Sequence, residues 1–533
     1  EQSRLGIPVL FGYDVIHGFR TTYPISLAQA CSWNPALVKQ AAEVAAQEAR
    51  MSGVEWTFSP MIDVARDGRW GRVSEGYGED PYANAVYGVA AVEGYQGNNL
   101  ADSRRVAACL KHFVGYGASE AGRDYVYTEI SRQTLWDTYM PPYQAGIEAG
   151  AATVMSCFND ISGTPGTANP YILTEVLKER WAHDGFVVSD WAAIEQLRSQ
   201  GVAADRKEAA EKAFNAGVEM DMRNRCYDAH LAALVREGKV SQEKLDEAVR
   251  RVLRLKFRLG LFERPYTPES EETDRFLLPA SLAVAERLAE ESMVLLKNEN
   301  NTLPLKAARR IAVIGPMAQN RLHLLGAWSA HGREEDAVSL FAGLENEYRG
   351  RAELLYARGC DFDGEDRSGF REAVAATAAA DVVVLCLGEK KQWSGENASR
   401  STIALPEIQE QLAAELAQTG KPLVLVLSSG RPLELCRLEP LCGAMVQMWQ
   451  PGIRGGNPLA GILSGRINPS GRLAMTFPRS TGQIPIYYNR RQSGRTHQGK
   501  YQDIPSTPLY EFGHGLSLSL IHISEPTRLL SIS

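Results

Sequence analysis

The sequence lacks the features that mark membrane-spanning, nucleic-acid-binding and metal-binding proteins. None of its apolar runs approaches the length of a membrane span. The formal net charge is -7 at pH 7, and this acidic balance argues against nucleic acid or an anionic membrane as the main partner. The eight cysteines form no Cys-x-x-Cys pair. Most of them lie inside apolar segments, so we expect small core residues rather than metal ligands or a disulfide framework.

Both ends of the chain also lack expected features. The first residues, Glu1 to Arg4, include no Met and no signal peptide, and they precede an expected strand by only a few positions. The last stretch, residues 518–533, is apolar and rich in Ser, and it resembles translated vector sequence. We therefore expect a fragment of a longer protein with a non-native tail, and we exclude that tail from the fold.

The first half of the chain alternates between expected strands and expected helices. A length of 533 residues predicts two or three domains. Six β-prone runs are candidate strands, at residues 6–14, 54–63, 106–112, 152–159, 186–190 and 217–221. Helical patterns lie between them, at 35–51, 80–96, 131–149 and 170–183. The alternation predicts an α/β fold with a parallel sheet. Six units indicate most of a (β/α)8-type barrel, truncated at its N-terminus because its first segment precedes Glu1.

The candidate strands end in polar side chains. These are Asp14, Asp63, Lys111 with His112, Asn159, Asp190 and Asp221. Each one taken singly can be a helix cap. The carboxyl ends of parallel strands share one face, however, and α/β enzymes keep their chemistry there. A carboxylate-rich ring would repel an anion, so it predicts a neutral ligand rich in hydroxyl groups. Trp191, directly after Asp190, offers an apolar face that suits a sugar ring.

The second half of the chain predicts another doubly wound α/β domain. A helix at 242–261 closes the first part, a linker with two prolines follows at 262–272, and a helix is expected at 275–297. Candidate strands then lie at 310–316, 381–388, 422–428, 443–449 and 473–477. The glycine-rich loop 450–456 matches neither nucleotide-binding spacing, which disfavours a nucleotide site there.

The loop at residues 389–400 is the second candidate for chemistry. It is polar, contains one Trp and Glu396, and follows a candidate strand. Functional loops are expected at the carboxyl ends of such strands. A glutamate in such a loop is ordinarily a solvated surface charge. Glu396 becomes a candidate only if the second domain folds this loop over the mouth of the barrel.

A series of motifs in register gives the chain a resemblance to glycoside hydrolase family 3, and within it to the bacterial periplasmic β-glucosidase type. The motifs are Gly-Tyr-Asp-Val-Ile-His-Gly at 12–18, Arg-Trp-Gly-Arg at 69–72, Glu-Gly-Tyr-Gly-Glu-Asp-Pro at 75–81, Lys-His-Phe at 111–113, Ser-Asp-Trp at 189–191, Glu-Ser at 291–292, Leu-Leu-Lys-Asn at 295–298, Asn-Pro-Ser-Gly-Arg-Leu at 468–473 and Phe-Gly-His-Gly-Leu-Ser at 512–517. The resemblance runs from about residue 4 to 517.

The resemblance implies a role for particular residues. In this family a barrel and an α/β sandwich share the active site, and a fibronectin type III-like domain often follows. Asp190 lies at the family's nucleophile position, and Glu396 is the best match to the general acid/base. Substrate-holding positions map to Asp14, Arg72, Lys111, His112, Met155 and Trp191.

A retaining two-carboxylate mechanism follows from these roles. Asp190 would attack the anomeric carbon while Glu396 protonates the leaving oxygen, and Glu396 would later activate the water that releases the sugar. Such an enzyme needs its carboxyl groups roughly 5 to 5.5 Å apart and requires no metal or organic cofactor. We expect Arg72 and Lys111, if close, to keep Asp190 ionised at neutral pH, and we expect a bell-shaped pH profile.

Of three alternatives to an exo-acting β-glucosidase, the first is disfavoured and two stay open. The β-N-acetylglucosaminidase branch of the family has a catalytic Asp-His pair on a barrel loop, but residues 113–120 contain no His. β-Xylosidase members tend to have Glu where this chain has Asp14, so xyloside or mixed activity ranks second. A catalytically inactive sugar-binding fragment is the third alternative. The expected partner is a small carbohydrate, with no nucleic acid and no membrane.

The resemblance also suggests boundaries, assembly and location. We predict a barrel over 1–262, a linker and connecting helix over 263–298, a sandwich domain with the acid/base loop over 299–490, and a linker over 491–517 towards a missing fibronectin type III-like domain. The family implies a monomer or homodimer in the periplasm or secreted from the cell.

Overall fold

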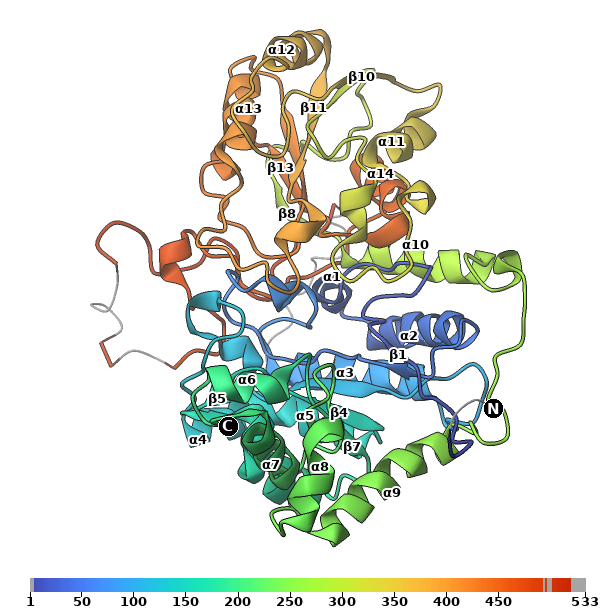
Figure 1. The fold of residues 1–533 in the computed structure, drawn as a ribbon. Helices are drawn as coiled ribbons and strands as arrows, with labels where there is room; N and C mark the ends of the chain where they lie inside the picture. Colours follow the sequence, from blue (N-terminus) through green and yellow to red (C-terminus); the bar gives the residue numbers. More distant parts are fainter. Residues whose placement is uncertain (1–3, 492–493, 496–500, 519–533) are drawn as a thin grey trace, which may run out of the picture.

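The computed structural model describes residues 4–491, 494–495 and 501–518. Its two halves form two lobes, with the first half of the chain below and the second half above in Figure 1. Helix α10 (Pro279–Ser292) lies between the lobes and connects them. Within the described ranges, no helix is long and apolar enough to span a membrane. The expected tail begins at Leu518, and from residue 519 on it lies outside the described residues.

The first lobe contains a parallel succession of short strands in chain order. Its paired strands are β1 (Gly12–Tyr13), β2 (Trp56–Thr57), β3 (Cys109–Phe113), β4 (Thr153–Ser156) and β7 (Phe186–Val188). Single parallel bridges join Trp56 to Ala107 and Val188 to Met220. Each of the six predicted strands therefore pairs, though over fewer residues than predicted. Among the described residues no pairing joins Met220 back to β1, so the succession is open rather than closed into a ring.

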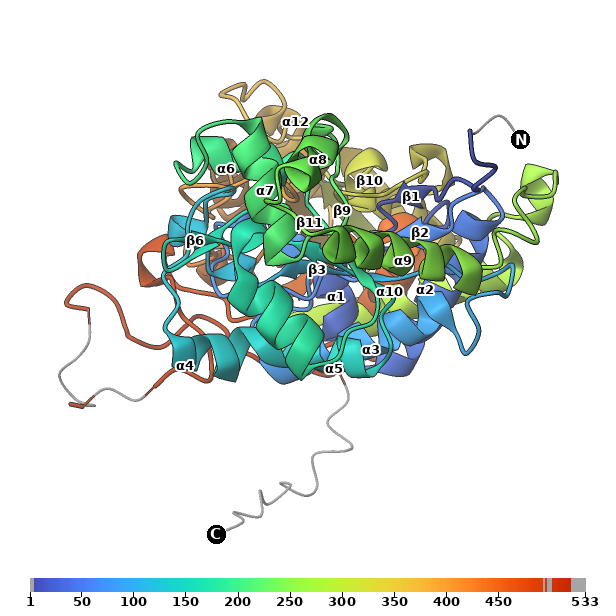
Figure 2. The same ribbon diagram turned by 60° about the horizontal axis from the view of Figure 1, so that its bottom comes forward.

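Helices cover the outside of these strands (Figure 2). They are α1 (Ser26–Cys31), α2 (Pro35–Arg50), α3 (Pro81–Gln96), α4 (Arg132–Thr134), α5 (Met140–Glu148), α6 (Ala193–Ser199), α7 (Arg206–Ala216), α8 (Cys226–Arg236) and α9 (Gln242–Arg258). A π-helical segment, Tyr171–Arg180, stands where an α-helix was predicted, and a hairpin of β5 (Asp160–Ile161) and β6 (Thr164–Pro165) precedes it.

Local capping explains where the predicted helices begin. The Asn34 side chain accepts from the backbone N–H of Leu37 at 3.1 Å, and Asp80 accepts from that of Ala83 at 2.7 Å. Each cap is followed by a proline at the first helical position, where the missing N–H costs nothing. Gly94 then lets α3 approach α2 closely, because a Cβ at this position would lie 2.5 Å from the Lys39 carbonyl oxygen.

The second lobe is built on a six-stranded sheet. The strands are β8 (Val294–Asn298), β9 (Arg310–Ile314), β10 (Glu353–Ala357), β11 (Val382–Gly388), β12 (Leu423–Ser428) and β13 (Ala444–Gln447), in the order β10-β9-β11-β12-β13-β8. All neighbours are parallel except β8, which runs antiparallel to β13. Helices α11 (Leu340–Tyr348), α12 (Phe370–Ala379), α13 (Glu407–Ala417) and α14 (Gly456–Ser464) complete it.

Two expectations for this lobe were wrong, and one strand was not predicted. The helix predicted at 275–297 ends at Ser292, because the fully buried run Val294-Leu295-Leu296 pairs with β13 instead. The predicted strand 473–477 makes only one bridge, between Phe477 and Tyr510. The edge strand β10 was not predicted, because it begins with an exposed Glu353 and is only half buried. The predicted domain boundaries stay a prediction, although β8 places part of the expected linker in the sheet.

Candidate active site

A cavity of about 750 Å³ lies between the two lobes, a size suited to a small-molecule ligand. Its lining residues are Asp14, Phe58, Arg72, Lys111, Tyr125, Met155, Asp190, Trp191 and Met222 from the first lobe, with Ala327, Trp328, Lys391, Gln392, Ser394, Glu396 and Asn397 from the second. All predicted site residues except His112 line it. The two lobes thus supply opposite walls of one cavity.

Not every polar strand end reaches this cavity. Asp63 lies behind it, bonded to His112. Asn159 donates to the Val114 carbonyl oxygen at 3.4 Å and to the Thr128 hydroxyl at 3.2 Å, away from the cavity. Asp221 accepts from the backbone N–H groups of Cys226 and Tyr227 at the start of α8. The predicted ring of six strand ends is therefore wrong for these three, which support neighbouring elements.

Asp190 follows β7 and is nearly buried, with a relative exposure of 7%. Its Oδ1 accepts from the Trp191 backbone N–H at 2.7 Å. Its Oδ2 lies 3.5 Å from Nε2 of His112. Burial raises the pKa of Asp190 to about 7, although Arg72 and Lys111 act in the opposite direction. The two cations therefore act as predicted, but burial outweighs them, and the carboxyl group is only partly ionised at pH 7.

Glu396 reaches the cavity from the loop 389–400, which rests on the first lobe. The backbone N–H of Gly395 donates to the Gly71 carbonyl oxygen at 2.7 Å, and that of Asn397 donates to Asp124 at 2.7 Å. The Glu396 Oε1 accepts from the Tyr125 hydroxyl at 2.6 Å. Glu396 was a candidate only if the second lobe folds this loop over the strand ends of the first. The structure shows this arrangement, so Glu396 stays a candidate.

A buried arginine holds both sides of this loop contact together. Arg431, at 0% exposure, donates from Nη1 to the carbonyl oxygens of Gly68 and Arg69, both at 2.9 Å. Its Nη2 donates to the Ala398 carbonyl oxygen at 2.9 Å. Gly71 is required at this junction, because a Cβ there would lie 2.3 Å from the Gly395 carbonyl oxygen. Backbone contacts between the lobes therefore set the position of Glu396.

Arg72 interacts with both candidate carboxylates. Its Nε and Nη2 bind Glu75 at 3.0 Å each, and its Nη1 lies 3.8 Å from Oε1 of Glu396. Burial opposes its charge, but Glu75 and Glu396 outweigh this and raise the pKa of Arg72 well above its usual value. The bidentate pair with Glu75 fixes the guanidinium so that one nitrogen points towards the cavity.

Lys111 and Asp14 form a second ion pair on the cavity wall. The Lys111 Nζ lies 2.8 Å from Oδ1 of Asp14, and 5.6 Å from the ring centroid of Trp328. Burial opposes the charge on Lys111, but Asp14 and Glu75 raise its pKa. A carboxylate beside an ammonium group offers both acceptors and donors to vicinal hydroxyl groups.

His112 reaches the site only through Asp190. It is 1% exposed, and its Nδ1 and backbone N–H both lie 2.9 Å from Oδ2 of Asp63. Burial, Arg72 and Lys111 lower the pKa of His112 well below its ordinary value, so the ring is neutral. His112 is not among the residues that line the cavity, and its predicted contact with substrate stays a prediction.

Several lining residues had not been identified from the sequence. Tyr125 and Trp328 line the cavity and contact Glu396 and Lys111 respectively. Neither residue belongs to a motif of the family resemblance or ends a strand, so no local sequence pattern pointed to them. His17, which belongs to the first motif, supports this wall indirectly, since its Nε2 lies 2.6 Å from the Ala327 carbonyl oxygen.

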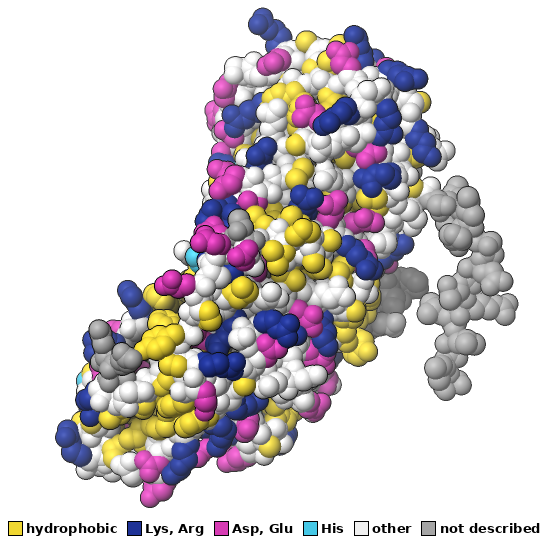
Figure 3. All heavy atoms as spheres, turned by 90° about the vertical axis from the view of Figure 1, so that its right-hand side faces the viewer, with side chains coloured by type: hydrophobic (Ala, Val, Ile, Leu, Met, Phe, Trp, Pro, Cys, Tyr) yellow, Lys and Arg dark blue, Asp and Glu magenta, His cyan; other side chains and the backbone are white. Residues whose placement is uncertain are grey.

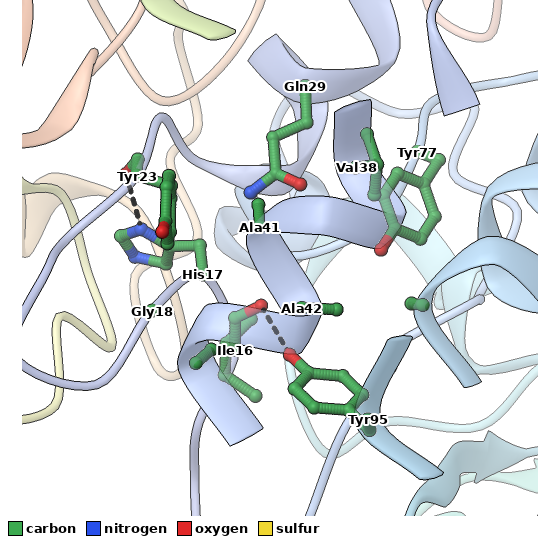
Figure 4. Close-up of a pocket in the computed structure, with 12 residues that line it drawn as sticks. Ile16, His17, Gly18, Tyr23, Gln29, Val38, Ala41, Ala42, Tyr77 and Tyr95 are labelled. Atoms are coloured by element: carbon green, nitrogen blue, oxygen red, sulfur yellow. Dashed lines mark hydrogen bonds between the residues drawn. The ribbon is translucent and has the colours of Figure 1, made fainter. Parts of the chain in front are cut away.

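A second cavity lies behind His17 in the core of the first lobe (Figure 4). It measures only about 10 Å³, between His17, Tyr23, Tyr95 and the alanines of α2. The Nδ1 of His17 lies 2.9 Å from the Tyr23 carbonyl oxygen on its wall. A space of this size holds one water molecule at most. It is therefore too small to bind a substrate.

Comparison with known proteins identifies relatives over nearly the whole chain. Residues 1–255 match the Glycosyl hydrolase family 3 N terminal domain, and residues 293–518 match the family's C-terminal domain. The chain is 41% identical to a periplasmic beta-glucosidase of Salmonella typhimurium, covering 98% of this chain and 73% of that protein. It is 35% identical to a beta-xylosidase of Formosa agariphila, covering 98% and 76%.

Solved structures show the same similarity in three dimensions. The beta-glucosidase from Listeria innocua superimposes with a TM-score of 0.93 at 43% identity, over 97% of this chain and 72% of that one. A structure of that enzyme in complex with glucose has the same TM-score. Both family domains match in order, and the chain shares the two-domain α/β fold of these structures. The chain therefore belongs to glycoside hydrolase family 3 and is a hydrolase of O-glycosyl bonds.

Proposed function

We propose that this enzyme is a retaining, exo-acting β-glucosidase that releases terminal β-D-glucose by double displacement. The observation that carries the proposal is the single cavity bounded by Asp190 from one lobe and Glu396 from the other. Asp190 acts as the nucleophile, and Glu396 acts first as general acid and then as general base. Arg72 interacts electrostatically with both carboxylates, because its Nη1 lies 3.8 Å from Oε1 of Glu396 and its charge lowers the pKa of Asp190 against the effect of burial.

The remaining wall residues suit a neutral sugar. Asp14 and Lys111 offer paired acceptors and donors to hydroxyl groups, while Met155 and Trp191 offer apolar surface to the ring. The Salmonella and Listeria relatives are named as β-glucosidases, and the Listeria enzyme has been solved with glucose. β-Xylosidase or mixed activity is the second candidate, because the Formosa relative carries that name. The same relatives favour a periplasmic or secreted enzyme acting on a small carbohydrate.

We also propose that the strands of the first lobe belong to a (β/α)8-type barrel. An apolar groove of about 430 Å³ runs between the segment before β1 and Met220, where the parallel succession is open. Leu5 and Val9 beside it are 65% and 60% exposed, and hydrophobic side chains gather on this face of the lower lobe in Figure 3. Exposed apolar surface beside an open strand edge is where further strands would pack.

Hydrolysis of 4-nitrophenyl β-glucoside tests the activity, with 4-nitrophenyl β-xyloside as the competing substrate. We expect a higher kcat/KM for the glucoside and loss of turnover in Asp190→Asn. Proton NMR should detect β-glucose as the first anomer released. A 2-deoxy-2-fluoro glucoside should leave a covalent adduct on the peptide that contains Asp190. Release of α-glucose, or an adduct elsewhere, would contradict the mechanism, and preference for xyloside would move the assignment to the second candidate.

A further inference from the structure

A short segment of the first lobe, residues 122–125, lies against the loop 389–400 that carries Glu396. Tyr125 at the end of this segment lines the cavity, whereas the partly buried Asp124 beside it does not. Asp124 is therefore not placed to touch a substrate, and the proposed hydrolysis gives it no role. Its hydrogen bonds nevertheless join the two lobes next to the proposed acid/base.

The Asp124 carboxylate is anchored on the core of the first lobe. Its Oδ1 accepts from Nε1 of Trp70 at 3.0 Å and from the Tyr116 hydroxyl. These two aromatic side chains are 1% and 0% exposed, and their rings meet edge to face with centroids 5.1 Å apart. Burial and the charge of Asp124 raise the pKa of Tyr116 well above its usual value, so its hydroxyl stays protonated and donates. The buried core therefore fixes this oxygen of the carboxylate.

The other oxygen of Asp124 and its backbone hold the second lobe. Oδ2 accepts from the backbone N–H of Asn397 at 2.7 Å, and the backbone N–H of Asp124 donates to Oγ of Ser399 at 3.0 Å. Both partners follow Glu396 closely in the chain. One aspartate therefore holds the loop at two points after Glu396, while the Gly71 carbonyl oxygen accepts from the residue before it.

The backbone of Tyr125 has a conformation that few bulky residues adopt. Its φ angle is 61°, and such a conformation persists where the surrounding contacts determine it. The Tyr125 backbone N–H donates at 3.1 Å to the Tyr116 hydroxyl, the same group that binds Asp124. The Tyr125 side chain in turn donates to Oε1 of Glu396 at 2.6 Å. The network around Asp124 thus also places the hydroxyl that binds the proposed acid/base.

We propose that Asp124 is a positioning residue that holds Glu396 in its reacting position relative to Asp190. The inference rests on the proposed role of Glu396 as general acid. Two catalytic carboxylates on different lobes react only if the lobes are fixed to each other, since a displacement near 1 Å can cost about 10²-fold in rate. Asp124 makes this connection from the lobe that carries Asp190.

The variant Asp124→Ala tests this role. It removes the acceptor of the Asn397 N–H, so that the loop around Glu396 can move away from the first lobe. We expect kcat/KM for an alkyl β-glucoside, which reports the step that needs the acid, to fall by about 10²-fold. The loss for 4-nitrophenyl β-glucoside should be smaller, because nitrophenolate leaves without protonation. A merely structural role would reduce the amount of active enzyme and so lower both values by the same factor.

Asp124→Asn keeps the shape of the side chain if the alanine variant does not fold. Its amide has one oxygen where the carboxylate has two, so it cannot accept both from Asn397 and from the Trp70 and Tyr116 pair. We expect the same dependence on the leaving group with a smaller loss. Equal losses on the two substrates would overturn the proposal in this variant as well.

Asp160→Ala is the matched control. The Asp160 carboxylate accepts from the backbone N–H of Thr128 at 3.2 Å, three residues after Tyr125 and within the first lobe. This variant loosens the same region while it leaves the contacts of loop 389–400 in place. Any loss of kcat/KM should be equal on the two substrates. A loss that depends on the leaving group as strongly as that of Asp124→Ala would contradict the positioning role.

Amide hydrogen exchange separates this inference from the proposed function, because it needs no activity. Exchange in peptides that cover residues 396–399 should be faster in Asp124→Ala than in the wild type and unchanged in Asp160→Ala. Unchanged exchange in Asp124→Ala would overturn the positioning role. Glu396→Gln, measured on the same two substrates, tests the acid role itself. If that variant loses equally on both, the proposed function of Glu396 fails, while hydrogen exchange still decides whether Asp124 holds the loop.

Discussion

The two carboxylates of the site are placed by opposite means. Asp190 follows a buried strand of the first lobe, is 7% exposed, and lies among buried ion pairs. Glu396 belongs to a loop of the second lobe, its side chain is 26% exposed, and hydrogen bonds from backbone groups seat that loop on the first lobe. The first carboxylate is thus controlled by burial, and the second by the fit between lobes.

This difference means that the structure controls the pKa of Asp190 but the location of Glu396. A strand end surrounded by the core can raise a carboxyl pKa, because it excludes water from the group. A loop that crosses from another lobe remains partly solvated, so what the structure controls is its location. Variants at the two carboxylates and around them should therefore differ in stability as well as in activity.

The largest effect is expected for Asp190→Asn. Turnover of 4-nitrophenyl β-glucoside should fall on the order of 10⁴-fold or more, because the covalent step is lost. The free energy of unfolding should rise by about 2 kcal/mol at pH 8, since a buried carboxylate is replaced by a neutral amide.

The pH dependence of that stability gain checks its cause. The pKa of Asp190 is raised in the folded state from 3.8 to about 7. The folded enzyme therefore loses stability as pH rises between these values, because the unfolded chain ionises first. Urea unfolding should show little gain for Asp190→Asn at pH 4 and the full gain at pH 8. A gain that does not depend on pH would contradict this account.

Glu396→Gln should reduce activity less and leave stability nearly unchanged. Loss of a general acid typically costs about 10²- to 10⁴-fold. The loss should be larger for an alkyl glucoside than for 4-nitrophenyl glucoside, because nitrophenolate leaves without protonation. Its partly exposed side chain predicts a much smaller change in unfolding free energy than at Asp190. Steady-state kinetics on both substrates, with thermal melts, measure the contrast, and equal losses on the two substrates would argue against an acid role.

Gly71→Ala tests the contact between loop 389–400 and the first lobe, and it leaves the carboxylate of Glu396 itself unchanged. The added methyl group would lie 2.3 Å from the Gly395 carbonyl oxygen and 2.7 Å from that of Ala398, so the loop must move. A displacement near 1 Å at a reacting group can cost about 10²-fold in rate. Gly68→Ala is the matched control, because its nearest contact would be an ordinary 3.6 Å. Equal activities of the two variants would show that the contact of the loop with Gly71 does not position Glu396.

Tyr125→Phe should have the smallest effect. It removes the hydroxyl that donates to Glu396 at 2.6 Å and leaves the rest of the loop contact intact. One hydrogen bond of this kind contributes about 0.5 to 1.5 kcal/mol, which corresponds to a loss of about two- to thirteenfold in kcat/KM. Kinetics with an alkyl glucoside measure it, and a loss as large as that of Glu396→Gln would mean that Tyr125 itself takes part in the chemistry.

The sequence predicted much of this architecture where patterns are local. Short apolar runs ending in polar residues located β3 and β7, and Val-, Ile- and Leu-rich runs located β9, β11, β12 and β13. The helical patterns at 35–51 and 80–96 begin where the structure has the caps Asn34 and Asp80. Prediction failed at β8, where an apolar run after a helix could continue it or pair with a sheet. That choice depends on a partner strand far away in the chain.

The sequence by itself determined the alternation of strands and helices, the carboxylate after β7 and the motifs that carry the family resemblance. Only the tertiary structure decided that Glu396 and Asp190 share one cavity, that Tyr125 and Trp328 belong to it, and that Asp63, Asn159 and Asp221 do not. The physical reason is range. Periodicity and capping act over a few residues, whereas burial, ion pairing and the fit between lobes arise when distant segments pack together.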